Sequence, residues 1–337
     1  IIETIFTALI SIVGIPANFL LFLTLVYNKR FRKPLHIMLC SISVFDFCTV
    51  CVSSLYPYSI MKNKWDLGKV LCDTVALIQA SCISLTLMTH ALVAVNCYLK
   101  SKFRSNLAQI LTGSRAVIIS LLVNVVLVGL VVVLPHLIGY VQADYAPMLG
   151  LCVSAWTADV VQNIETQIYI HFTICSIVPY VICIFAYARV LVIIGERQNT
   201  FENEIIKRQF VNACKRMGIL FIAFTICYLP FTIYTLVDPY LSTIPTWAIR
   251  ILLIIFHSHV VVNPLICLIS MSDINEGLRH MLTRAPRVKS FSSFSSTQRH
   301  LSKEQKCKST TVAKVTYSNS SVASDKATGA DRMNSWM

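Results

Sequence analysis

The stretch AVIISLLVNVVLVGLVVVLP, residues 116–135, is an apolar run without a charged side chain. An α-helix needs about 20 apolar residues to cross the hydrocarbon core of a bilayer. Six further runs of this kind lie on either side of it, at residues 3–28, 35–61, 72–99, 167–194, 210–236 and 246–270. None shows the alternation of a membrane β-barrel strand, so the backbone must satisfy its hydrogen bonds within helices. The sequence therefore predicts an all-α membrane protein, a bundle of seven transmembrane helices.

The composition excludes several other classes of protein. Of the 337 residues, 55% are hydrophobic and only 13% are charged, yet the formal net charge is +13. This hydrophobicity is too high for a disordered chain. The charges are too few to cover a soluble or a nucleic-acid-binding surface. A channel or transporter is the main alternative, but it predicts polar residues along several helices, and only one acid is embedded here.

The basic residues predict the orientation in the membrane. Of the 29 Lys and Arg residues, 25 lie in the first, third and fifth connections and in the C-terminal tail. Segments rich in Lys and Arg stay in the cytoplasm. We therefore expect a multi-pass plasma-membrane protein with its N-terminus outside and its C-terminus in the cytoplasm.

Asp46 is the one carboxylate well inside a predicted span, and a charge at such depth is costly enough to suggest a function. Asn18 and Asn263 lie at similar estimated depths in the first and seventh helices. Thr86 and His259 are placed to face the same point. We expect this polar cluster to hold a hydrated cation, with Na⁺ as the first candidate. The alternative is a neutral, protonated Asp46 hydrogen-bonded to the two amides.

Cys72 and Cys152 are both assigned to the outer side, where oxidation is permitted. A bond between them would hold the long fourth connection over the helix ends. The other cysteines lie in or beside spans or in the cytoplasmic tail. A disulfide is therefore the expectation, and two free thiols are the alternative.

Six motifs then resemble those of rhodopsin-like (class A) G-protein-coupled receptors in order and spacing, over about residues 3–284. They are Gly14–Asn18, Ser43–Asp46, Trp65 and Gly68 before Cys72, Pro179 with Tyr187, Phe224 with Cys227–Pro230, and Asn263–Cys267. The resemblance implies a receptor, not an enzyme, that transmits the binding of an extracellular ligand to a heterotrimeric G protein. It also implies three regions: the bundle at 1–270, a short amphipathic eighth helix at 271–284, and a Ser-, Thr- and Lys-rich cytoplasmic tail at 285–337.

The resemblance places a ligand pocket in the outer third of the bundle. The candidate lining residues are Gln79, Ile83, His171, Phe224, Tyr228 and His257. Gln79 stands where amine receptors carry an Asp, so a cationic amine is not expected. His257 stands at the opsin Lys, so a covalent retinal cofactor is not expected either. The alternative for each His is a packing role.

Within the family the chain looks most like melatonin-receptor and opsin-like members, for example at Leu134-Pro135-His136. His136 and Trp156 stand where the melatonin group has a pocket Asn and a pocket Gln. A small ligand other than an amine is therefore the expectation, and melatonin itself is a weak candidate.

The chain departs from the family at the switch between resting and active states. Asn96-Cys97-Tyr98 replaces Asp/Glu-Arg-Tyr, Tyr228 replaces the sixth-helix Trp, and Cys267 replaces the NPxxY Tyr. The remaining candidates on the switch and G-protein face are Tyr187, Lys215, Arg216, Pro230 and Pro264. Two hypotheses follow. One is an active receptor with a divergent switch, and the other is a receptor-like protein that binds ligand or dimerises but couples poorly.

The tail has its own hypothesis. Residues 290–297 are dense in hydroxyl side chains beside basic residues, and such a segment buries too little apolar area to fold. The family implies that phosphorylation of this segment recruits an arrestin-like protein. The alternative is a passive solvated tail.

Overall fold

The computed structural model describes residues 2–102, 113–139, 141–155, 169–196, 204–238 and 243–283. Within these residues, seven helical spans are long and apolar enough to cross a membrane. They cover Ile2–Tyr27, Pro34–Lys62, Lys69–Lys102, Ser114–Leu137, Tyr169–Gly195, Val211–Val237 and Thr246–Ser270. The predicted seven-helix bundle is therefore confirmed. The tail at 285–337 lies outside the described residues.

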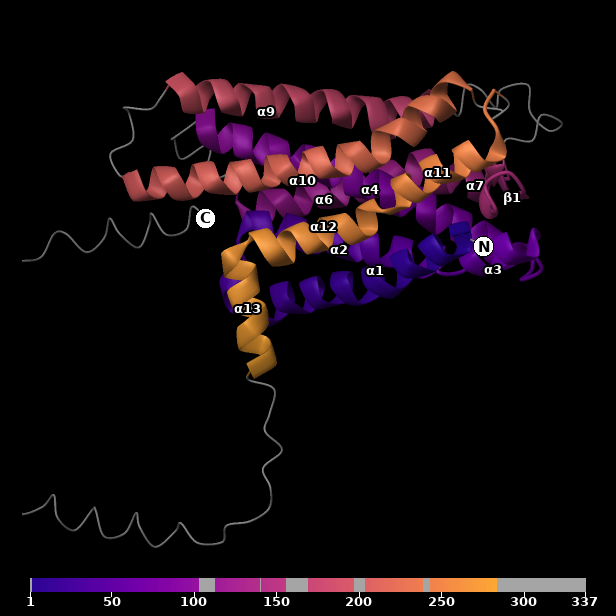
Figure 1. Ribbon diagram of the computed structural model, residues 1–337. Helices are drawn as coiled ribbons and strands as arrows, with labels where there is room; N and C mark the ends of the chain where they lie inside the picture. The colour runs from indigo at the N-terminus through magenta and orange to yellow at the C-terminus, as the bar shows by residue number, and fades with distance from the viewer. Residues whose placement is uncertain are drawn as a thin grey trace, which may run out of the picture. The chain divides into compact units, whose positions relative to one another are not determined.

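The helices lie side by side with alternating direction (Figure 1). Their bounds are α1 Ile2–Tyr27, η1 Lys29–Phe31, α2 Pro34–Ser53, α3 Tyr56–Lys62, α4 Lys69–Lys102, α6 Ser114–Val128, η2 Gly129–Val133, α7 Leu134–Leu137, η3 Thr173–Ile177, α9 Val178–Glu196, α10 Glu204–Val237, α11 Thr246–His257, α12 His259–Ser270 and α13 Ser272–Thr283. After Met271, α13 turns sharply away from α12 (Figure 1).

Two of the spans contain a π-helical turn just before a proline. The turn η2 precedes Pro135, and η3 precedes Pro179. Proline has no N–H to donate to the preceding turn, so the ladder of backbone bonds is locally rearranged there. A π-turn adds a residue to the helix and changes the direction of the side chains around it. In the fifth span this change of direction concerns His171, which precedes η3, and Ser176, which lies within it.

The seventh span breaks at Ser258. Its N–H donates to the carbonyls of Ile254 and Ile255 and closes α11, while its own carbonyl accepts from Val261 and Val262 and opens α12. The break separates His257 from His259, so the two imidazoles enter different parts of the bundle.

The fourth connection forms a two-stranded antiparallel hairpin, β1 Gln142–Ala146 and β2 Leu151–Ala155, in which Tyr145 pairs with Cys152. Gly150 has a positive φ of 73°, which suits the tight turn between the strands. We name this end of the bundle the hairpin end and the opposite end the α13 end. The hairpin was not predicted from the sequence.

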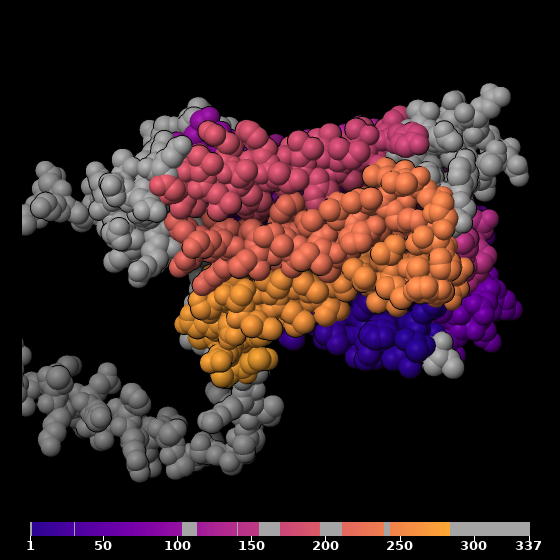
Figure 2. Space-filling view, turned by 45° about the horizontal axis from the view of Figure 1, so that its top comes forward, coloured from indigo at the N-terminus to yellow at the C-terminus, as the bar shows by residue number. Residues whose placement is uncertain are grey.

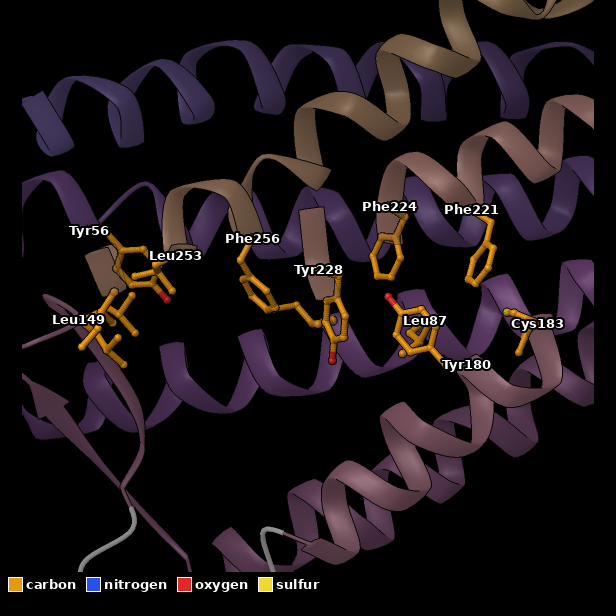
Figure 3. Packing of buried hydrophobic residues seen from close by; sticks show 14 of the residues in the cluster. Tyr56, Leu87, Leu149, Tyr180, Cys183, Phe221, Phe224, Tyr228, Leu253 and Phe256 are labelled. Atoms are coloured by element: carbon orange, nitrogen blue, oxygen red, sulfur yellow. The ribbon is translucent and has the colours of Figure 1, made fainter. Parts of the chain in front are cut away.

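The bundle interior is packed with aromatic rings. Phe221, Phe224, Tyr228 and Phe256 form a row between the helices (Figure 3). Phe224 stacks on Tyr228 with ring centroids 5.2 Å apart. Most large apolar side chains of α6 and α9, in contrast, face outward, and α9 and α10 present neighbouring outer surfaces (Figure 2). Such an apolar exterior is suited to lipid.

Candidate functional site

A cavity of about 260 Å³ lies at the hairpin end. Its walls come from α4, η3, α10 and α11, and β2 covers it with Leu151, Val153 and Ser154. Because the elements that enclose it are distant in sequence, only the folded bundle creates it. Sites of this kind between helices are typical places for small-molecule binding.

The lining combines apolar surface with neutral polar groups. Among the described lining residues none is Asp, Glu, Lys or Arg, and His171 is the one titratable imidazole. His171 Nε2 lies 3.2 Å from Ser84 Oγ. Ser176 Oγ lies 3.0 Å from the Tyr228 hydroxyl. These two pairs of polar side chains therefore meet each other at the cavity wall, and Ser84 also donates to the Ala80 carbonyl.

Four of the six predicted pocket residues line this cavity: Gln79, Ile83, His171 and Tyr228. Phe224 does not, because it lies one helical turn deeper, fully buried between His90 and Tyr228. His257 does not reach the cavity either. The placement of these two in the lining was wrong, since counting residues gives depth along a helix but not the neighbour that covers a side chain.

His257 instead lies outside the cavity and contacts Gln79, which lines it. Its Nδ1–H donates to the Leu253 carbonyl at 2.9 Å, so its Nε2 accepts from Gln79 Nε2 at 2.8 Å. The hydroxyl of Tyr56 donates to Gln79 Oε1. Gln79 is thus held from both ends by buried partners, which fixes the orientation of its amide toward the cavity.

The polar cluster lies deeper, around Asp46. Asn263 Nδ2 donates to Asp46 Oδ2 at 2.9 Å, and Thr86 donates to Oδ1 at 3.0 Å. His259 Nε2 lies 3.9 Å from Oδ1. Asn18 does not bond to Asp46, because its amide nitrogen donates to the carbonyls of Gly14 and Val260. The alternative interpretation, in which Asp46 bonds to both amides, therefore agrees with the structure for Asn263 but not for Asn18.

The cluster is rich in unused acceptors. His259 Nδ1–H donates to the Phe256 carbonyl at 2.6 Å, which leaves a lone pair on Nε2 of the neutral imidazole. Within the described part of the chain, this Nε2, Asn18 Oδ1 and Asn263 Oδ1 have no hydrogen-bond partner. Together with the carboxylate they form a fully buried group of acceptors, which is electrostatically suited to a positive charge.

A disulfide, several hydrogen bonds and an ion pair hold the hairpin in place over the cavity. The predicted disulfide between Cys72 and Cys152 is present. Ser59 of α3 donates to the Gly150 carbonyl at 2.5 Å. Arg250 donates from Nε to the Met148 carbonyl at 3.0 Å and forms an ion pair with Glu3 at 2.7 Å. Arg250 was not predicted as a site residue, although it is the one Lys or Arg inside the seventh span.

Most of the switch candidates lie toward the α13 end, whereas Pro230 lies beside Phe231, which lines the cavity at the hairpin end. Asn96, Cys97 and Cys267 are buried, Pro264 is buried in α12, and Pro230 is exposed in α10. Tyr98 is half-buried and lies beneath the ammonium of Lys102. The buried hydroxyl of Tyr187 has no partner among the described residues. Lys215 is exposed, while Arg216 reaches Asp273 of α13 at 3.7 Å.

Known proteins with a similar sequence or fold place this architecture in a family. The profile of the seven-transmembrane receptors of the rhodopsin family matches residues 17–266. The chain belongs to this rhodopsin family. It is a multi-pass membrane receptor, because it has seven apolar spans and the family is one of seven-transmembrane receptors. The relatives named below are likewise receptors and not enzymes.

The mouse melatonin receptor type 1A is 26% identical over 259 residues, with 72% of this chain and 68% of the relative covered. The violet-sensitive opsin of Xenopus laevis is 23% identical over 239 residues, covering 68% of this chain and 66% of the opsin. The crystal structure of squid rhodopsin superposes with a TM-score of 0.74 over 92% of this chain and 91% of that one, at 16% identity. At this identity the last likeness concerns the fold alone.

Proposed function

We propose that this rhodopsin-family chain is a receptor for a small, uncharged extracellular ligand and that it passes the signal to a heterotrimeric G protein. The observation that carries the ligand class is the cavity beneath the hairpin, whose described lining has no carboxylate, ammonium or guanidinium group. A buried ion without a counter-charge costs several kcal/mol in desolvation. A neutral ligand avoids this cost.

The support for a neutral ligand is strongest at Gln79. An amine ligand would need an acid there, and the amide is already engaged by Tyr56 and His257. A covalent retinal is not proposed, because His257 replaces the required Lys and its Nε2 is bonded to Gln79. What remains for recognition is apolar contact with Ile83, Phe231 and Leu253 plus one or two neutral hydrogen bonds.

Three probes with the same ring test the ligand class: neutral naphthylacetamide, cationic naphthylmethylamine and anionic naphthylacetate. Binding is measured by isothermal titration to the full chain in lipid nanodiscs. The amide is expected to bind at least about tenfold more tightly than either ion, since that ratio needs only about 1.4 kcal/mol. Ala80→Phe, which adds a ring to the cavity lining, is expected to abolish binding.

A charge swap makes the same test sharper. Gln79→Glu keeps the size of the side chain and places a carboxylate in the cavity. The amine is then expected to overtake the amide. If the amine already binds best to the unchanged chain, or if Gln79→Glu leaves the order as it was, the neutral-ligand proposal is wrong.

The proposed orientation has the hairpin end outside. It is supported by the 25 of 29 basic residues that the sequence places in the first, third and fifth connections and in the tail, because such residues remain in the cytoplasm. An epitope after Met337 should then be reached by antibody only in permeabilised cells. An epitope before Ile1 should be reached in intact cells.

Coupling to a G protein is proposed together with its rival, ligand binding without efficient coupling. Exposed Lys215 and the Arg216–Asp273 pair offer a basic face at the α13 end. Basal activation of a G protein that falls when Lys215 and Arg216 become Gln would support coupling. A flat response with every G-protein class would favour the rival.

Binding of Na⁺ at Asp46 is proposed as a regulatory feature. The carboxylate and the unpartnered oxygens of Asn18 and Asn263 supply the hard oxygen donors that such a cation prefers. The residues that would hold it are these three with Thr86, next to His259. Ligand affinity is then expected to depend on NaCl but not on choline chloride, and this dependence should vanish in Asp46→Asn.

Recruitment of an arrestin-like protein by the phosphorylated tail is proposed from the sequence alone, because residues 290–297 lie outside the described residues. Replacing the serines of this segment with alanine should remove agonist-dependent arrestin recruitment and leave G-protein activation unchanged. Unchanged arrestin recruitment would favour a passive tail.

A further inference from the structure

Tyr98 and Lys102 of α4 meet Phe185 of α9 on the outer surface of the bundle, toward the α13 end. The rings of Tyr98 and Phe185 lie edge to face with their centroids 6.0 Å apart, and the Lys102 ammonium lies 5.5 Å from the Tyr98 centroid. Lys102 is exposed, and so is 57% of Phe185. We propose that these three residues, together with Val181 and Arg189 of α9, bind one anionic phospholipid.

The three residues of α9 form a stripe along the helix. Val181, Phe185 and Arg189 follow each other at intervals of four residues, and side chains with this spacing lie on one face of a helix. Val181 is 61% exposed, and Arg189 is exposed as well. Because Phe185 contacts Tyr98, this face borders α4, against which α9 packs. The stripe therefore leads from two apolar side chains to a base, as a lipid leads from its acyl chain to its phosphate.

The position of Arg189 along the fifth span matches the depth of lipid phosphates. This span begins at Tyr169, and Arg189 is 20 residues further along. Twenty helical residues cover about 30 Å, which is about the thickness of the hydrocarbon core of a bilayer. With Tyr169 at one boundary of the core, Arg189 therefore lies at the other. Tyr98 suits the same boundary, because tyrosine is enriched where a membrane meets water.

The two cations select an anionic lipid as the occupant. A guanidinium donates two parallel hydrogen bonds to a phosphate, and an ammonium adds a point charge from the neighbouring helix. A phosphatidylcholine headgroup carries its own cation, whereas phosphatidylglycerol carries a net negative charge that Lys102 and Arg189 neutralise together. The acyl chain of the same molecule covers Val181 and Phe185. A soluble phosphate has no apolar part for these two side chains, so the lipid is the better fit.

A lipid at this place joins α4 to α9 at the level of the Asn96-Cys97-Tyr98 stretch. A molecule that binds the folded chain and not the unfolded one raises the stability of the fold by mass action. Phosphatidylglycerol is therefore expected to raise the melting temperature of the chain in proportion to its occupancy. Neither the extracellular ligand nor a G protein takes part, so the lipid site stands or falls separately from the proposed function.

Native mass spectrometry of the full chain in detergent micelles compares phosphatidylglycerol with phosphatidylcholine of the same acyl chains. One phosphatidylglycerol is expected to stay bound, with an affinity at least about tenfold above that of phosphatidylcholine, since two bases act on its charge. Arg189→Gln and Lys102→Gln should each weaken phosphatidylglycerol binding by about fivefold, the effect of one base beside an anionic lipid. Equal affinity for the two lipids overturns the proposal.

Lys29→Gln is the matched control, because it removes an exposed base of η1, which packs against α13 and not against α9. Its affinity for phosphatidylglycerol should equal that of the unchanged chain. Arg189→Lys keeps the charge but loses the planar fork, so its affinity should lie between those of the unchanged chain and Arg189→Gln. An equal loss in Lys29→Gln and Arg189→Gln would mean a diffuse attraction to the basic end, which also overturns the proposal.

A second measurement locates the lipid on the unchanged chain and needs no variant. Phosphatidylglycerol with a photoreactive diazirine in its acyl chain is irradiated with the full chain in phosphatidylcholine nanodiscs, and the labelled peptides are mapped by mass spectrometry. The label is expected to concentrate on the peptide with Val181 and Phe185, and an excess of unlabelled phosphatidylglycerol should remove it. Even labelling of the outer faces of α1, α6 and α9 overturns the site. Loss of the label with soluble glycerophosphoglycerol would mean that the headgroup alone is bound, which overturns the lipid as occupant.

Discussion

Arg216 Nη1 of α10 lies 3.7 Å from Asp273 Oδ1 of α13, and His36 Nε2 of α2 lies 3.4 Å from the other carboxylate oxygen. The hydrogen bond from His36, assisted by the backbone and by the charge of Arg216, holds the pKa of Asp273 below its usual range. A carboxyl group with a lowered pKa keeps its interactions above its ordinary value of about 4 and loses them only in stronger acid. The three helices therefore remain joined at neutral pH.

This junction predicts the effect of Asp273→Asn. Removal of the charge releases α10 from α13, so basal activation of a G protein is expected to rise. Stability should change by less than about 1 kcal/mol, because the Asp273 side chain is 49% exposed and such pairs are screened by solvent. Nucleotide exchange on the G protein measures the first effect and the melting temperature the second.

The control for Asp273→Asn is Asp73→Asn, which removes an exposed pair with Lys69 inside one helix. Its basal activity should equal that of the unchanged chain. Equal or lower basal activity in Asp273→Asn would show that the junction does not restrain α10.

Asp46 predicts a pair of opposite stability changes in sodium-free buffer. Asp46→Ala removes the acceptor of Asn263 and Thr86, and each donor left unpaired costs about 1–3 kcal/mol. Asp46→Asn keeps an acceptor and turns a new N–H toward the lone pair of His259. The alanine variant is expected to melt well below the unchanged chain, and the asparagine variant at or above it. Thermal unfolding in detergent would contradict this if both variants lost the same stability.

Arg250 predicts a change in the rate of ligand exchange. Its guanidinium is 18% exposed and bonds to Met148, Pro147 and Glu3, so it joins the hairpin turn to α1 and α11. Arg250→Ala removes charge-assisted hydrogen bonds worth about 1.5–3 kcal/mol each, and the hairpin should open more often. Dissociation of naphthylacetamide is expected to accelerate.

Arg250→Lys separates charge from geometry, since an ammonium cannot reproduce the planar fork of the guanidinium. Arg250→Lys should restore the ion pair with Glu3 but not the hydrogen bonds to the two carbonyls. Its ligand dissociation rate should lie between those of the unchanged chain and Arg250→Ala. Lys62→Ala, an exposed base at the same end, serves as the control and should leave the rate unchanged. An unaltered dissociation rate in Arg250→Ala would show that opening of the hairpin does not control ligand exchange.

The fold was predictable from the sequence because the bilayer restricts it. A membrane span has to be long, apolar and helical, and each of the seven spans can be recognised on those grounds alone. The sequence also placed three residues at a similar depth in the membrane, because the rise per residue of a helix is constant. They are Asp46, Thr86 and Asn263, which are hydrogen-bonded in the structure. The Cys72–Cys152 disulfide was predictable because both cysteines were assigned to the outer side of the membrane, where thiols can be oxidised.

The details that escaped prediction depend on rotation and on contacts outside the spans. The π-turns before Pro135 and Pro179 shift the direction of side chains, and the break at Ser258 separates His257 from His259. Arg250 and Asp273 lie at helix ends, where partners come from other segments.

Gly277 predicts how tightly α13 is held. A Cβ at this position would lie 2.8 Å from Phe31 Cε2 and 3.2 Å from Asn28 Nδ2. Phe31 is only 4% exposed and packs on His36 with ring centroids 4.8 Å apart, so its ring has no room to yield. Gly277→Ala is therefore expected to destabilise the chain by about 1–3 kcal/mol, the range for an overpacked core.

Gly218→Ala in α10 is the matched control, because nothing lies within 4 Å of its added Cβ. Alanine favours a helix interior by about 0.5–1 kcal/mol over glycine, so this variant should melt at a higher temperature. Displacement of α13 should also weaken the contact of His36 with Asp273, so Gly277→Ala should raise basal activation of a G protein as Asp273→Asn does. A Gly277→Ala variant that gains stability like Gly218→Ala would mean that α13 does not pack against Phe31.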